Sequence, residues 1–343
     1  MTDRSDETDR SAAGDETEAM SDGDGTETPS AGDETETPSV ASTATTVGDL
    51  VARDRRRPAP ALHATTRDRT YSYFDLCNTA AKAGNVLRHV GVRPGDTVAV
   101  DPTAHPESVL TALGAGLIGA TVTFDPAVGE HGDARALVVH TDREEAVTAP
   151  PGTSLVVFGA QPTTEGATHW ETEVWSENPM APPAPTGTDD PAVAVADETV
   201  SHRTLLATAG EPAPDPDTAV VLATGRLDAT TYGAGVIAPL AAGGVAVVTP
   251  AGDGEEDGGR DTNDATRDSA GDTDDPAGSL TADGDDSTGS LTDDGSPSVA
   301  DAVAAAAGLA GVERVHVVGG TETGVGDGAD GFGVPVERVT VDE

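Results

Sequence analysis

The fold is decided by residues 71–100, which read YSYFDLCNTAAKAGNVLRHVGVRPGDTVAV. Ser72 and Asp75 stand three residues apart, the spacing of a capping box that begins a helix. Apolar side chains then recur at helical spacing, at Leu76, Ala80, Ala83, Leu87 and Val90. Gly91 and Pro94 end this predicted helix, and a short apolar strand is expected directly after them, at residues 97–100.

The same alternation continues outward from this stretch. A second helix is expected at residues 106–117 and a strand at residues 120–124, and a strand, helix and strand at this spacing predict a right-handed crossover in a parallel sheet. Further apolar runs are expected to continue the sheet, at residues 136–140, 154–158, 219–223 and 245–249, followed by a helix at 299–309 and a strand at 312–318. The predicted fold class is α/β, with mostly parallel sheets flanked by helices.

Two segments lack any apolar periodicity. Residues 1–45 repeat the pentapeptide TETPS, and residues 251–296 repeat GSLT among aspartates. Such sequences cannot bury enough apolar surface to offset the entropy lost on ordering, so both are predicted to be disordered and acidic. The expected organisation is a tail at 1–45, an α/β region at 46–250, an insertion at 251–296 and the end of the α/β region at 297–343.

The charge of the chain restricts its partners. The 343 residues carry 61 acids against 19 basic residues, a formal net charge of −42, and Lys82 is the single lysine. This acidity disfavours nucleic acid and anionic membrane as partners. It fits a cytoplasmic protein adapted to concentrated salt, where charges are screened within about 3 Å at 1 M. The alternative is an acidic protein that binds a partner, for example by mimicking DNA.

Other features exclude further classes of protein. Cys77 is the single cysteine, so neither an intramolecular disulfide nor a multi-cysteine zinc site can form. The polar, acidic N-terminus does not resemble a secretory signal. The uncharged stretch at residues 229–252 is long enough to span a bilayer, but its prolines and glycines favour a helix, a turn and a buried strand instead.

Residues 71–126 carry a specific resemblance to a known family. The YSYFDL opening, the GVRPGDTVAV segment that begins at Gly91, the LGAGLIGA segment that begins at Leu113 and the FDP triplet at 124–126 occur in the order and spacing found in the N-terminal region of the adenylate-forming (AMP-dependent) superfamily. That superfamily includes acyl-CoA and acetyl-CoA synthetases. The resemblance covers most of residues 60–343 outside the predicted insertion, and it is patchier after residue 126.

The resemblance also indicates what this chain lacks. DPAVAV at residues 190–195 resembles the strand that leads into the family's phosphate loop, and VSHRTLL at 200–206 resembles the helix start after it. The family places a Ser/Thr- and Gly-rich loop ending in Pro-Lys-Gly between them, whereas only residues 196–199 (ADET) connect them here. We therefore expect the phosphate loop to be deleted. The family's hinge and C-terminal domain, with its catalytic lysine, are likewise expected to be missing after Glu343.

Three residues are candidate site residues by resemblance. Thr321 and Glu322 fall in a GTETG segment that resembles the family's nucleotide and Mg²⁺ motif, so they would contact AMP or ATP, and Glu322 would help to hold Mg²⁺. His202 would lie near the substrate. The plainer alternatives are a polar turn for the first two and an ordinary helix-start histidine for the third. We expect no catalytic residue and no certain cofactor.

Two functions compete. The first is a catalytically degenerate member of the superfamily, a pseudoenzyme that serves as a binding or interaction module and partners a complete synthetase or a separate C-terminal domain. The second is an acid–thiol ligase, an ATP-dependent acyl-CoA or acetyl-CoA synthetase that forms an acyl-adenylate. Adenylation requires neutralisation of the phosphate charge, and the sequence offers no evident source for it. The first function is therefore expected.

Overall fold

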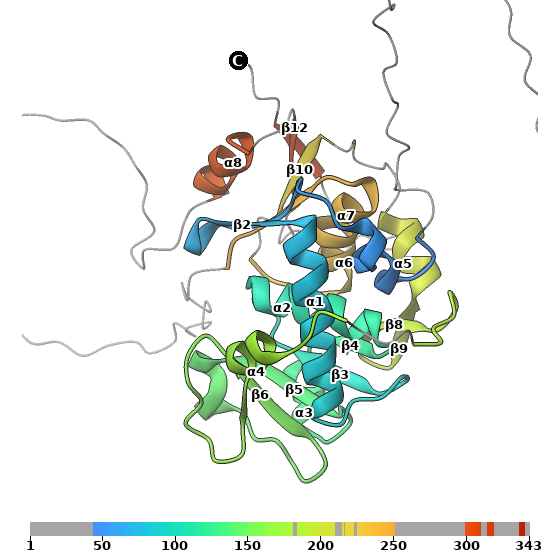
Figure 1. Ribbon diagram of the computed structural model, residues 1–343, viewed down its shortest axis with the longest axis vertical. Helices are drawn as coiled ribbons and strands as arrows, with labels where there is room; N and C mark the ends of the chain where they lie inside the picture. The colour runs from blue at the N-terminus through green and yellow to red at the C-terminus, as the bar shows by residue number, and fades with distance from the viewer. Residues whose placement is uncertain are drawn as a thin grey trace, which may run out of the picture. The chain divides into compact units, whose positions relative to one another are not determined.

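The computed structural model describes residues 44–180, 184–209, 215, 217–222, 225–250, 299–309, 314–318 and 336–339. All of them belong to one compact unit of the chain, residues 39–343. The strands of these residues form two sheets, not the single continuing sheet that the sequence predicted (Figure 1). The predicted fold class, mostly parallel sheets flanked by helices, is confirmed.

The first sheet contains the strand that was predicted at residues 97–100. Its described strands are, in spatial order, β7 (Thr168–His169), β6 (Ser154–Phe158), β5 (Ala136–His140), β3 (Thr97–Val100), β4 (Thr121–Thr123), β8 (Pro191–Val195) and β9 (Glu198–Ser201). Neighbouring strands are parallel except for the antiparallel pair β8 and β9. The strands predicted at 97–100, 136–140 and 154–158 have the predicted bounds, and β4 is one residue shorter at each end.

The second sheet contains the apolar runs that were expected to extend the first. Its described strands are, in spatial order, β13 (Val336–Val339), β12 (Arg314–Val318), β10 (Thr218–Leu222), β11 (Val245–Val248), β1 (Pro60–Ala64) and β2 (Arg69–Ser72). The expectation was wrong for β10 and β11 because the antiparallel strand β9 occupies the edge of β8. β11 pairs instead with β1, a strand that the sequence analysis did not predict.

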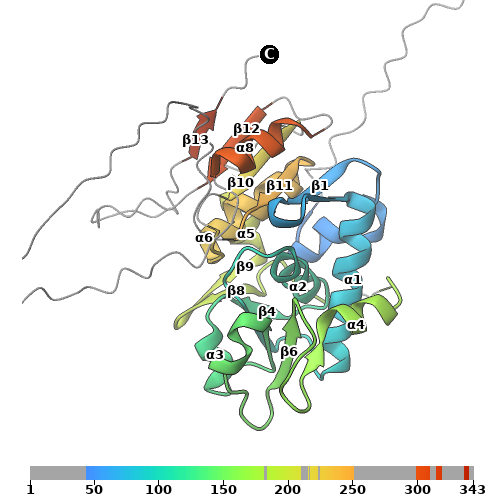
Figure 2. The same cartoon turned by 90° about the vertical axis from the view of Figure 1, so that its left-hand side faces the viewer.

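Helices cover both faces of the first sheet (Figure 2). On one face pack α1 (Tyr73–His89), α2 (Pro106–Leu117) and α4 (Trp170–Ser176); on the other lies the short α3 (Pro126–Glu130). The predicted capping box is present, because Ser72 accepts the Asp75 N–H and Asp75 accepts the Ser72 N–H. The large apolar cluster under α1 and α2 includes residues of both sheets, among them Val98, Leu222 and Val248.

Glycine allows α1 and α2 to touch. A Cβ atom at Gly114 would lie 2.6 Å from the carbonyl oxygen of Ala80, and one at Gly84 would lie 2.8 Å from that of Gly114. No side chain fits at such distances. The two glycines therefore let α2 lie close to α1.

Short helices surround the second sheet. They are α5 (His202–Ala209), α6 (Ala229–Tyr232), the π-helical turn η6 (Gly233–Ile237), α7 (Ala238–Ala242) and α8 (Val299–Ala307), with 3₁₀ turns η2 (Val47–Val51), η3 (Arg53–Arg55) and η4 (Thr65–Arg67). A further 3₁₀ turn, η5 (Thr141–Ala146), follows β5 and belongs to the first sheet. The apolar stretch that starts at Ala229 forms α6, η6, α7 and the buried β11, as expected. Within the described ranges, no helix is long and apolar enough to cross a membrane.

The remaining predictions of organisation are not tested. Residues 1–43 and 251–298 lie outside the described residues, so the predicted disordered tail and insertion stay predictions. The division into four segments proposed from the sequence stays a prediction as well.

Candidate functional site

The first sheet changes its winding direction between β3 and β5. From β3 the chain passes through α2 to β4 on one side, whereas β5, on the other side of β3, is followed by β6 still further away. In open parallel sheets, ligands bind beyond the carboxyl ends of the strands at such a switch point. Asp101 follows β3 and His140 ends β5, so these two residues mark the position.

Asp101 joins the ends of the two strands. Its side chain is fully buried. Oδ1 accepts the Thr103 N–H at 2.8 Å, and Oδ2 accepts the His140 N–H at 3.1 Å. Arg143 Nε lies 3.7 Å from Oδ2. A buried carboxylate is tolerated only with such partners, so Asp101 holds the switch point together.

An aromatic cluster lies beside Asp101. The rings of His105 and His140 stack with their centroids 4.5 Å apart, and Phe158, at the end of β6, meets the His105 ring edge-on at 5.5 Å. Burial lowers the pKa of His105 below its ordinary value, and the neighbouring His140 lowers it further. A neutral imidazole is therefore favoured at this position.

The loop after β3, residues 101–105, also connects the two sheets. The Ala104 N–H donates to the Gly225 carbonyl at 2.8 Å, and the Leu227 N–H donates to the Pro102 carbonyl. Thr103 and Arg226 form an isolated antiparallel bridge. Because Gly225 follows β10, the carboxyl end of β3 meets the segment beyond the carboxyl end of β10. We take this junction, residues 101–105 with 225–228, as the candidate functional site.

The β8–β9 connection lies where the phosphate loop of the family was expected to be deleted. Antiparallel pairing continues to Val195 opposite Glu198, which leaves Ala196 and Asp197 as a two-residue turn. Ala196 has a φ of +50°, in the left-handed region that favours glycine. Asp197 and Glu198 are exposed. The turn therefore presents carboxylates, and it is too short to form a cradle of backbone N–H groups around a phosphate.

His202 begins α5 and is buried. Its Nδ1 accepts the Val47 N–H at 3.2 Å, so the ring proton lies on Nε2, which has no hydrogen-bond partner among the described residues. Burial lowers its pKa, with Asp190 and Asp49 acting in the opposite direction. The hydrogen bond to Val47 connects α5 to η2, which fits the alternative that His202 is an ordinary histidine at the start of a helix. These contacts do not test a role near a substrate.

The other sequence-predicted site residues, Thr321 and Glu322, lie outside the described residues. Their placement relative to His202 stays a prediction. Asp101, His105 and His140 were missed by the sequence analysis, although a signal was present. Asp101 directly follows one predicted parallel strand and His140 ends the next one in space, and the carboxyl ends of parallel strands are where ligands bind.

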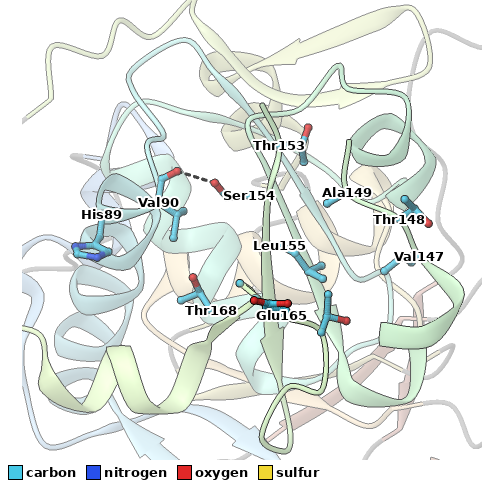
Figure 3. Close-up of a pocket in the computed structure, with 13 residues that line it drawn as sticks. His89, Val90, Val147, Thr148, Ala149, Thr153, Ser154, Leu155, Glu165 and Thr168 are labelled. Carbon is cyan, nitrogen blue, oxygen red and sulfur yellow. Dashed lines mark hydrogen bonds between the residues drawn. The ribbon is translucent and has the colours of Figure 1, made fainter. Parts of the chain in front are cut away.

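A separate depression lies at the opposite ends of the strands. It has a volume of about 650 Å³ and is lined by the end of α1, by residues near the start of β6 and by the loop before β7 (Figure 3). Ser154 at its rim is already engaged, since its hydroxyl donates to the Val90 carbonyl at 2.9 Å. Its position at the amino ends of the strands makes it a weaker candidate than the switch point.

No group of three or more His, Cys, Asp or Glu side chains that could hold a metal ion occurs in the part of the chain that the structure describes. His140 is close to one acid, with Nδ1 3.0 Å from Asp142 Oδ2.

Two sheets joined beyond the carboxyl ends of their strands define an α/β domain like the N-terminal domain of adenylate-forming enzymes. The model of the family described as "AMP-binding enzyme" matches residues 51–225, about half of the chain, and the chain belongs to this family. The resemblance drawn from residues 71–126 is thereby confirmed. No curated protein sequence matches this chain.

Solved structures share this fold. The anthranilate CoA ligase AuaEII, in complex with anthranoyl-AMP, is 21% identical with a TM-score of 0.50, over 60% of this chain and 45% of that one. The nonribosomal peptide synthetase FmoA3, bound to alpha-methyl-L-serine-AMP, is 21% identical with a TM-score of 0.51, over 62% of this chain and 25% of that one. This chain thus spans less than half the length of either protein.

Proposed function

We propose that this chain is a non-catalytic member of the AMP-binding enzyme family that keeps the family scaffold as a binding or interaction module. The observation that carries the proposal is the two-residue turn at Ala196 and Asp197. To be bound, a nucleoside triphosphate needs backbone N–H groups, hydroxyls or cations around its phosphates. Adenylation also requires that the charge developing on the phosphates be neutralised. Asp197 and Glu198 offer negative charge instead.

The rest of the proposal concerns the setting of the protein. Its partner would be a complete synthetase or a separate C-terminal domain, and its acidity would keep it dissolved in the cytoplasm of a cell rich in salt. Lys82, the single lysine, lies within α1 and so does not belong to the β8–β9 turn. Thr321 and Glu322 would supply any remaining contact with AMP, ATP or Mg²⁺.

Family membership favours one alternative, an ATP-dependent acyl-CoA synthetase that forms an acyl-adenylate. Exchange of labelled pyrophosphate into ATP distinguishes a non-catalytic module from a synthetase, since only an enzyme that forms an acyl-adenylate catalyses this exchange. We expect no exchange in concentrated salt with acetate or other carboxylic acids, while a family member with an intact phosphate loop supports exchange in its own buffer. Robust exchange that depends on a carboxylic acid would overturn the proposal.

A matched variant tests whether the carboxylates of the turn or its short length prevents nucleotide binding. The double variant Asp197→Asn, Glu198→Gln removes both carboxylates but leaves the turn length unchanged. In calorimetric titrations with ATP and Mg²⁺, we expect the double variant to bind no more tightly than the unmodified chain, because the N–H donors are missing in both. Tight binding by the double variant alone would mean that repulsion, and not the short turn, keeps the nucleotide away.

A further inference from the structure

His105 has two possible partners at the junction of the two sheets. It is the N-cap residue of α2 and directly follows Ala104, whose N–H donates to the Gly225 carbonyl beside the second sheet at 2.8 Å. Its ring stacks on the ring of His140, with the two ring planes only 9° apart. Glu107 stands two residues further along the chain, in the first turn of α2. A change of partner at His105 would therefore act on the loop that connects the sheets.

The stacked position of His105 is held by ring contacts. Its ring meets those of His140 and Phe158, and within the described ranges neither of its ring nitrogens forms a hydrogen bond. The residue is also partly exposed. His140 is held more firmly, because its backbone N–H donates to Asp101 and its Nδ1 lies 3.0 Å from Asp142 Oδ2. His105 is therefore the member of the stacked pair that can move.

Glu107 offers a charged partner that the stacked ring does not use. Its side chain is buried, and its Oε1 accepts Arg67 Nη1 at 2.6 Å. Its Oε2 is buried and has no hydrogen-bond partner among the described residues. A buried carboxylate oxygen without a donor is unfavourable. A protonated imidazole can supply that donor, and Glu107 lies close enough to His105 to raise its pKa.

The charged groups that face His105 act in both directions. Burial lowers the pKa of His105, as do His140 at the end of β5 and Arg67 in η4, whereas Glu107 in α2 and Asp101 after β3 raise it. Asp101 already accepts two backbone N–H groups, so Glu107 is the acid with a free oxygen. The stacked ring stays neutral near pH 7 because the lowering effects are the stronger ones. Two further charged groups of the junction, both in η5, face Asp101 and His140 respectively: Arg143 and Asp142.

We propose that His105 is a proton-sensitive latch between the two sheets. When neutral, its ring stacks on His140; when protonated, the ring leaves His140 and donates to the free Oε2 of Glu107. A buried carboxylate then balances the charge of the imidazolium. Because His105 follows Ala104 in the connecting loop, the movement loosens the contact between residues 101–105 and 225–228 as the pH falls below about 6.5. The proposal does not depend on whether the chain binds nucleotide.

NMR of the full chain in concentrated salt, followed from about pH 7.5 to about pH 5, tests the latch. We expect the nuclear Overhauser effects between the carbon-bound ring protons of His105 and His140 to disappear as His105 is protonated. Hydrogen exchange of the Ala104 N–H should then become about tenfold faster, after correction for the intrinsic effect of pH on exchange. The control is the Ser154 N–H, which donates to the Arg135 carbonyl at 3.0 Å near the start of β6 and should not become faster.

Three variants separate the latch from a simple titration. Glu107→Gln should lower the midpoint of ring separation by about one pH unit, because the imidazolium loses its charged partner. Glu145→Gln, at an exposed glutamate of η5, should leave the midpoint unchanged. His105→Gln carries no proton to gain, so its corrected exchange at Ala104 should not respond to pH. This last variant keeps the test decisive if Glu107→Gln does not fold.

Three results would overturn the proposal. The first is a pair of rings that stays stacked while His105 is protonated. The second is a midpoint that Glu107→Gln does not lower. The third is exchange at Ala104 that still becomes faster on acidification in His105→Gln.

Discussion

The junction at residues 101–105 and the turn at Ala196 and Asp197 both follow strands of the same sheet, but they differ in what surrounds them. At the junction a buried carboxylate, two stacked imidazoles and backbone hydrogen bonds tie β3 to β5 and to the second sheet. At the turn the side chains are exposed and the connection is as short as a hairpin allows. The junction therefore contains contacts that stabilise the fold, whereas the turn lacks the contacts that would bind a phosphate.

The largest effect is expected at the junction. Asp101→Ala removes the buried acceptor of two N–H groups and leaves both without that partner in a partly buried environment. We expect the free energy of unfolding to fall by about 3 kcal/mol. Denaturant unfolding in concentrated salt measures this change. Asp133→Ala is the matched control, because Asp133 is exposed, and its effect should stay within about 0.5 kcal/mol. Equal effects of the two variants would contradict the assigned role of Asp101.

A second prediction concerns pH at the same junction. Burial holds the pKa of His105 below its ordinary value of 6.5, so the folded state binds this proton less readily than the unfolded state. The stability that results is fully present above pH 6.5 and is lost as the pH falls below it toward the pKa of the folded state. Unfolding measured from pH 7 down to about pH 5 should therefore be less pH-dependent in His105→Gln.

The control for this prediction is His131→Gln, because His131 is exposed. Its pH dependence should match that of the unmodified chain. His63 and His202 also have pKa values lowered by burial, so part of the dependence should remain in His105→Gln. A pH profile of stability that His105→Gln leaves unchanged would contradict the lowered pKa of His105.

The smallest effect is expected at the turn. Ala196 has a φ of +50°, which costs an L-residue about 1 kcal/mol and a glycine nothing. Ala196→Gly should stabilise the chain by about 0.5 kcal/mol once the greater freedom of glycine in the unfolded state is counted. Ala194→Gly, within β8, should instead destabilise it by about 0.5 to 1 kcal/mol. A loss of stability in Ala196→Gly would show that the turn is not strained.

Much of the fold could be predicted from local pattern. The capping box at Ser72, the helix at 106–117 and the strands at 136–140 and 154–158 are set by spacing that a single segment contains. The division into two sheets could not be predicted, because it depends on which strand edges remain open, and β9 and β1 gave too weak a pattern to be recognised. The connection between the sheets likewise consists of backbone hydrogen bonds over a long sequence separation.

The candidate site could be predicted less well. The short connection after Val195 could be recognised because the sequence has only four residues where the family has a longer loop. In the structure this connection is a tight hairpin between β8 and β9. Asp101, His105 and His140 look like ordinary loop and strand-end residues until the topology shows that β3 and β5 are neighbours. Thr321 and Glu322 were proposed by resemblance alone, and their part in any site stays a prediction.

The most direct test of the account is the response of the turn itself to nucleotide. Amide resonances of Ala196, Asp197 and Glu198 can be followed by NMR while ATP and Mg²⁺ are added to the full chain in concentrated salt. We predict that these three amides do not shift, because their N–H groups do not form a phosphate cradle. Saturable shifts at all three would contradict the account and return the chain to the catalytic members of its family.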